Sequence, residues 1–199
     1  MEVVMAVLIG LGLAAACGLR VFVPLLVLSI ATRIGAVSLG TGVHWVGTTE
    51  AMIALGVASV LEIVAYKVPW LDHVLDTIAS PAAVIAGTIV AASQVGQVTD
   101  VSPLLRWSAA LIAGGGIAGI VQTGTVSTRA ASTVTTAGIA NPIISALQSV
   151  ASVIMSIIAV VAPILAGILV VLLLFIAVAV VVKFRRWRNA SRRCEPAPI

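Results

Sequence analysis

The chain has 199 residues, of which 61% are hydrophobic and 9% are charged, and its formal net charge is +4. A soluble domain usually carries about 25% charged residues, so this composition excludes an ordinary soluble protein. The mean hydropathy of +1.23 instead predicts an all-α membrane protein with one helical transmembrane domain over residues 1–183.

Apolar runs predict the spanning helices, because a helix needs about 20 mostly apolar residues to cross a bilayer. The candidate segments are residues 3–32, 50–67, 79–96, 104–124, 141–162 and 163–183. The tryptophans lie at or just outside these ends, where interfacial indole rings are expected. The sequence therefore predicts five to six transmembrane segments.

The first segment is too long for one ordinary span. Gly18 and Pro24 both weaken a helix, and Arg20 lies between them. We expect either one long tilted helix or a helix that is broken near Gly18. Residues 143–182 pose a similar question, and two spans that meet near Pro163 are favoured over one kinked helix.

The C-terminal segment "KFRRWRNASRR" holds six of the eleven Lys and Arg residues, which predicts a cytoplasmic C-terminus. Residues 184–199 are expected to form a disordered basic tail. Six spans would place the N-terminus in the cytoplasm as well, and five would place it outside. Residues 57–69 resemble residues 150–163, which allows a 3+3 inverted repeat.

Glu62 lies well inside an apolar segment, where a charged side chain must face protein or water. Ser59, Glu62 and Tyr66 are spaced three and four residues apart and share one helix face. One interpretation is a structural ion pair with Arg20, in direct contact across two helices. The other is a carboxylate that binds a proton or a cation along a path.

Asp72, His73 and Asp76 form a second polar group, which could hold a cation through oxygen and imidazole ligands. The alternative is a short interfacial helix whose apolar side meets lipid, while these three side chains face water.

Hydroxyl residues surround Arg129 in residues 122–141, which we expect to form a loop that either binds an anion or is simply solvated. Beyond this segment, polar side chains recur at helical spacing on one face. They are Ser145, Gln148, Ser149, Ser152 and Ser156. Such a face should look into the bundle, either as contacts between helices or as the wall of a wet cavity.

An N-terminal "GLRVFVP" followed by "LEIVAYKVPWLDHVLD" resembles a bacterial membrane family known as domain of unknown function family 4126. The resemblance covers about residues 8–182, and Val21 and Tyr66 depart from the family's usual Pro and Asp. It implies a protein of the bacterial inner membrane and supplies no established activity.

The residues favour a transporter or channel for an ion or small polar solute. The alternative is a membrane scaffold that binds a partner protein or lipid. No enzyme signature is present, and we expect no catalysis, no cofactor and no nucleic-acid binding, while homo-oligomers are allowed. The expected path residues are Arg20, Glu62, Tyr66, Lys67, Arg129, Ser149 and Ser152.

Overall fold

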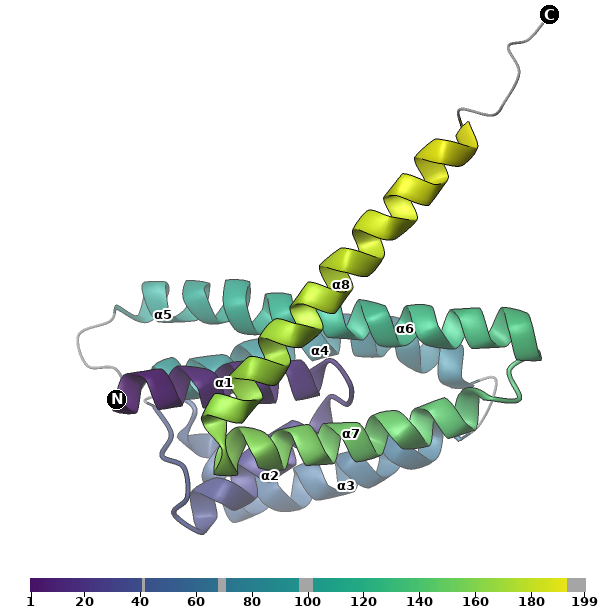
Figure 1. Ribbon diagram of the computed structural model, residues 1–199. Coiled ribbons are helices and arrows are strands. Elements are labelled where there is room, and N and C mark those ends of the chain that lie inside the picture. Colours follow the sequence, from purple (N-terminus) through teal and green to yellow (C-terminus); the bar gives the residue numbers. More distant parts are fainter. Residues whose placement is uncertain (41, 68–70, 97–101, 193–199) are drawn as a thin grey trace, which may run out of the picture.

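The structure is a computed structural model that describes residues 1–40, 42–67, 71–96 and 102–192. Every regular element in these ranges is a helix (Figure 1). Four helical stretches are long and apolar enough to cross a membrane: Val74–Val95, Pro103–Thr136, Asn141–Val161 and Pro163–Val180. The chain is therefore a multi-pass helical membrane protein, as its composition predicts.

The first segment is broken, which decides between the two alternatives that its sequence allows. Helix α1 (Glu2–Cys17) ends just before Gly18, and α2 (Phe22–Arg33) begins four residues later. Pro24 lies in the first turn of α2, where a missing N–H is tolerated. Gly18 packs so closely on α6 that a Cβ there would meet Val121 at 2.5 Å.

Together, α1 and α2 form a hairpin whose turn lies inside the bundle. The end of α1 is held by α7, because Ser152 Oγ donates to the carbonyl of Ala16 at 3.1 Å. Helix α2 then runs back, and Arg33 at its far end donates to Thr49 Oγ1 at 2.8 Å. Thr49 begins the next long helix, so the hairpin enters and leaves at the same end of the bundle (Figure 1).

After a short 3₁₀ turn η1 (His44–Gly47), helix α3 (Thr49–Ala65) starts at Thr48, whose hydroxyl accepts from the N–H of Ala51. Helix α4 (Leu71–Val95) is one continuous helix. The expected separate interfacial helix is therefore wrong: its residues form the first turns of this span.

Helices α5 (Pro103–Ala110) and α6 (Gly116–Thr136) are joined by a π-helical turn η2 (Leu111–Gly115) into one rod. The expected loop over residues 122–141 is wrong as far as Thr136. Its hydroxyls bond to backbone carbonyls of the preceding turn, so they are satisfied within a helix. The helix ends at Ala137, which has a left-handed φ of 51°.

The last two helices are α7 (Asn141–Val161) and α8 (Pro163–Arg192), and they meet at Ala162. This confirms the favoured break near Pro163. Helix α8 crosses the bundle and extends beyond it (Figure 1). It continues through Arg192, so residues 184–192 belong to this helix, and the rest of the expected tail lies outside the described residues.

Small residues let the inner helices approach closely. Leu13, Ala14 and Cys17 of α1 are fully buried. Gly114 of η2 faces Gly87 of α4 so closely that a Cβ on either would meet the other's backbone. The core therefore surrounds the hairpin, which carries Arg20 at its turn.

Candidate functional site

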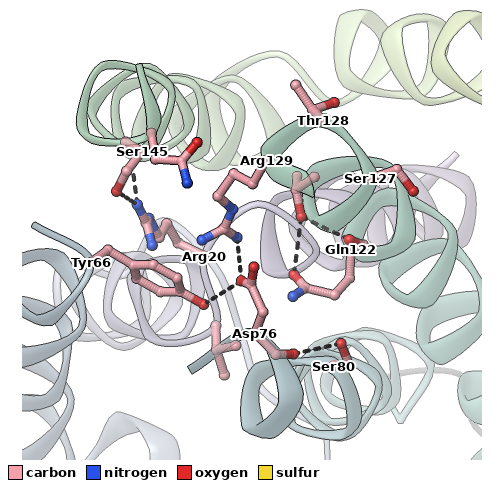
Figure 2. A network of polar contacts seen from close by, with 12 residues as sticks. Arg20, Tyr66, Asp76, Ser80, Gln122, Ser127, Thr128, Arg129 and Ser145 are labelled. Atoms are coloured by element: carbon pink, nitrogen blue, oxygen red, sulfur yellow. Dashed lines mark hydrogen bonds and ion pairs between the residues drawn. The ribbon is translucent and has the colours of Figure 1, made fainter. Parts of the chain in front are cut away.

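Polar side chains from five parts of the chain gather where the hairpin turns inside the bundle (Figure 2). We call this group the hairpin-tip cluster. It consists of Arg20, Glu62, Tyr66, Asp76, Arg129, Ser145 and Ser149. Its members come from the hairpin turn and from α3, α4, α6 and α7.

Glu62 caps the N-terminus of α2. One carboxylate oxygen accepts from the N–H of Val21 at 2.8 Å, and the other accepts from the N–H of Phe22 at 3.1 Å. The first N–H groups of a helix have no partner within it, and the helix dipole favours a negative charge there. Glu62 is 7% exposed, so it replaces water at a buried helix end.

Arg20 contacts α7 and not the Glu62 carboxylate. Its Nε donates to Ser149 Oγ at 3.0 Å, and its Nη2 donates to the carbonyl of Ser145 at 2.8 Å and to the Ser145 hydroxyl. The expected direct Arg20–Glu62 pair is wrong, although both residues belong to one cluster. The reason is that the adjacent α2 backbone already satisfies the carboxylate.

Tyr66 lies between the two buried arginines and Asp76. The guanidinium carbons of Arg20 and Arg129 lie 4.1 Å and 4.4 Å from the centre of its ring. Its hydroxyl donates to Asp76 Oδ1 at 3.2 Å. A ring face attracts cations, so Tyr66 holds two positive groups close together.

Asp76 forms a salt bridge with Arg129, with Oδ1 and Nη2 2.8 Å apart (Figure 2). Arg129 is 2% exposed and Asp76 is 12% exposed. The expectation that Asp76 faces water is therefore wrong. A buried cation on α6 draws it inward, and α6 is helical where a loop was expected.

Two hollows reach the cluster. A cavity of about 400 Å³ between α4 and α6 is lined by Asp76, Thr77, Ser80 and Arg129. A second cavity of about 370 Å³, between α2, α3 and α4, reaches Glu62 and Tyr66 past apolar side chains. The cluster is thus buried, but it can be reached through one cavity with polar lining residues and through another whose lining is mostly apolar.

The structure brings together most of the path residues that the sequence predicts. Lys67 is the exception, because it is exposed in the turn after α3. Ser152 bonds to the end of α1, next to the cluster. Asp72 and His73 belong to the start of α4, but their side chains lie outside the described part of the chain, so the metal-site prediction stays untested there.

The polar face of α7 looks inward, as its spacing predicts. Its serines and Gln148 are buried, while Val150, Val153, Ile154 and Ile157 are exposed. Ile158 is half-buried against the core.

A second inward face, on α6, is missing from the sequence interpretation. Gln122, Thr125, Arg129 and Ser132 are all buried. Their spacing of three, four and three residues is typical of one helix face. That signal was present in the sequence, and only the assignment of a loop concealed it.

Residues 7–183 match the sequence profile of the domain of unknown function DUF4126. The chain belongs to this family. Neither a curated protein nor a solved structure matches it. The match covers most of the helical bundle, from within α1 to within α8, and includes every residue of the hairpin-tip cluster.

Proposed function

We propose that this DUF4126 protein transports or conducts an ion or small polar solute across the bacterial inner membrane, with the hairpin-tip cluster as its site. One observation carries the proposal: a helix breaks inside the bundle and places Arg20 among polar groups from the surrounding helices. Transporters use broken helices in this way to present backbone dipoles and charges to a solute near the membrane centre.

The cluster has the chemistry to hold a small polar solute. Two guanidiniums supply several hydrogen-bond donors, and two carboxylates supply acceptors within the same group. Charged groups at this depth are costly and are usually tied to a pathway. Binding and release of a solute need no cofactor and no reaction.

The polar cavity between α4 and α6 supports a route to the site. It ends at the Asp76–Arg129 salt bridge, so an arriving solute meets a pair that can open and re-form. Ser80 and Thr77 line this cavity and can bond to a passing solute. The apolar cavity beside Glu62 suits lipid chains better than a polar solute, so we assign the route to the α4–α6 side.

The hairpin also suggests the topology. If α1 and α2 enter and leave on one side, then α3, α4, α5–α6, α7 and α8 provide five crossings. A cytoplasmic C-terminus then places the N-terminus outside. In this arrangement α2, α3 and α4 run opposite to α6, α7 and α8 respectively (Figure 1), as a 3+3 inverted repeat requires. A reporter at the N-terminus that is active only in the cytoplasm would contradict this topology.

Flux through proteoliposomes tests the function. Vesicles would be loaded with potassium chloride, potassium nitrate, potassium acetate or glycerol, and volume changes would be followed by light scattering, with valinomycin present for the salts. We expect at least one probe to cross faster than in empty vesicles. Arg20→Gln should abolish that flux, whereas Arg33→Gln, at the exposed end of the same hairpin, should leave it unchanged.

Ala130 and Ala131 provide a matched pair for the route. Both are exposed on α6, but Ala130 lines the polar cavity and Ala131 does not. Ala130→Trp should slow the flux about tenfold or more, and Ala131→Trp should not. Equal flux in the two variants would place the route elsewhere, and no flux of any probe through folded protein would overturn the transport proposal.

The scaffold alternative rests on a different observation. Ser145, Ser149 and Ser152 join α7 to the hairpin through hydrogen bonds of 2.8–3.1 Å, which suits a rigid platform. Under this alternative the protein would bind a partner protein or a lipid and pass no solute. The same vesicle experiment separates the two, since a scaffold predicts no flux in every variant.

A further inference from the structure

A groove of about 620 Å³ runs between α6, α7 and α8, on the side of α6 away from Asp76. We call it the α6–α8 groove. Its α8 wall is apolar and includes Leu173 and Ile176. Its α6 wall carries four hydroxyl groups, and Gln148 reaches it from α7. A hollow of this size with few polar groups is typical of ligand sites.

The hydroxyl groups on the α6 wall can only accept hydrogen bonds from an occupant. Each already donates its hydrogen to a backbone carbonyl: Thr123 to Gly119, Thr125 to Gln122, Ser127 to Thr123 and Thr128 to Gly124, at 2.7–2.8 Å. The oxygens of Thr123, Ser127 and Thr128 keep lone pairs for an occupant, whereas Thr125 is buried and its Oγ1 also lies 3.5 Å from the carbonyl of Gly18. This wall therefore offers acceptors to a ligand.

Gln148 adds an unsatisfied group at the inner end. Its side chain is 9% exposed, and its Oε1 is buried without a hydrogen-bond partner. Burial of an amide oxygen without a hydrogen-bond donor is unfavourable, so a ligand that donates a hydrogen bond to this atom would be stabilised in the groove. The amide nitrogen beside it can in turn donate to an oxygen of the same molecule.

The lack of charged side chains in the described lining of the groove argues against a charged ligand. Among the described residues that line the groove, none is Lys, Arg, His, Asp or Glu. A phosphate or carboxylate would enter without a counter-charge and face mainly acceptors, and an ammonium group would be buried without an anion. A hydroxyl group fits, because it donates to Gln148 Oε1 and accepts from the neighbouring amide nitrogen.

We propose that the α6–α8 groove binds a neutral membrane lipid whose headgroup carries free hydroxyls, such as a diacylglycerol. The hydroxyls lie at Gln148 and the α6 wall, and the chains lie along α8. Membrane lipid is the natural occupant, because α8 exposes apolar side chains on its outer side, including Phe175 and Leu172. The site is separate from the proposed transport route between α4 and α6.

Native mass spectrometry of the full chain in detergent tests the proposal. Dioctanoylglycerol would be titrated against dioctanoyl phosphatidic acid, which has the same chains with an anionic head, and against decylamine, which has a cationic head. We expect dioctanoylglycerol to saturate one site and the two charged probes to bind at least tenfold more weakly.

Gln148→Leu keeps the volume and removes the amide, so it should weaken dioctanoylglycerol binding about five- to tenfold, the worth of one to two hydrogen bonds. Gly124 and Gly116 supply a matched pair, because a side chain at either glycine meets open space. Gly124→Leu fills the groove and should abolish binding, while Gly116→Leu lies outside it and should have no effect.

Equal affinity for the three probes, or unchanged binding in both Gln148→Leu and Gly124→Leu, would mean that the groove takes up chains without recognising a headgroup, and would overturn the proposal. Solute flux in these variants keeps the two proposals apart. Gly124→Leu should lose the lipid and retain transport, since the α4–α6 cavity is untouched.

Discussion

Helices α6 and α7 are both rich in hydroxyl residues, but they use them differently. On α7, Ser145, Ser149 and Ser152 face inward and bond to the hairpin. On α6, Ser127 and Thr128 are exposed, and their hydrogens go to their own backbone. The same residue types therefore join helices in one place and line an open groove in the other.

This difference shows that the groups opposite a hydroxyl-rich helix face decide whether its hydroxyls bond to another helix or only to their own backbone. Arg20 and the open carbonyls at the end of α1 give the α7 serines something to bind. The side of α6 that lines the groove faces α8, whose described side chains there are apolar. Substitutions that remove a hydroxyl, or the group that it bonds to, should therefore have different effects on stability in α6 and in α7.

The largest effect should follow from breaking the Asp76–Arg129 salt bridge. Arg129→Leu removes the cation beside a mostly buried carboxylate, which we expect to cost about 3–5 kcal/mol of unfolding free energy. Steric trapping in bicelles measures this quantity. Asp76→Asn combined with Arg129→Leu should recover part of the loss, and strictly additive losses would show that the two side chains act independently.

A smaller effect should follow from Glu62→Gln. The new amide presents an NH₂ group to one of two backbone donors, so one charge-assisted hydrogen bond is lost and about 1.5–3 kcal/mol with it. Hydrogen exchange at Val21 and Phe22 should become faster. Glu50→Gln, at the exposed start of α3, is the control and should leave exchange at the hairpin unchanged.

The smallest expected effect comes from removing one hydroxyl group from α7 and one from α6, which compares the two helices directly. Ser152→Ala removes a hydrogen bond between helices, which should cost about 0.6–1.7 kcal/mol. Ser127→Ala removes a hydroxyl that bonds only its own helix, and the change should stay below about 0.5 kcal/mol. Equal losses of unfolding free energy in the two variants would show that the hydroxyl groups of α6 and α7 contribute to stability in the same way.

Sequence alone could predict the features that depend on one helix at a time. The inward face of α7, the weak point near Gly18 and the depth of Glu62 all follow from spacing and composition. The partners could not be predicted, because they depend on how helices far apart in the chain meet. Arg20 was expected to pair with Glu62, but Glu62 lies against the helix end that follows Arg20.

The loop expected around Arg129 shows a second limit. Ser and Thr are enriched in turns of soluble proteins, since there they compete with the backbone for hydrogen bonds. In a membrane helix the same hydroxyls bond back to their own helix and remain compatible with it. Hydropathy therefore placed the end of this span near residue 124, although the helix continues to Thr136.

The π-helical turn η2 sets the rotational phase of α6. Arg106, Ala110, Gly114, Ala118 and Gln122 recur every four residues, and all are buried. In a regular α-helix such a row would drift by about 40° per step, and the one additional residue in a π turn absorbs about 100° of that drift. Loss of a single residue here, such as the exposed Ile112, would convert the turn into regular α-helix and leave Arg129 facing Asp76. Straightening the turn with every residue kept would instead swing Arg129 about 100° away from Asp76. Deletion of one residue in this segment should therefore be tolerated better than insertion of one, because η2 already holds the additional residue.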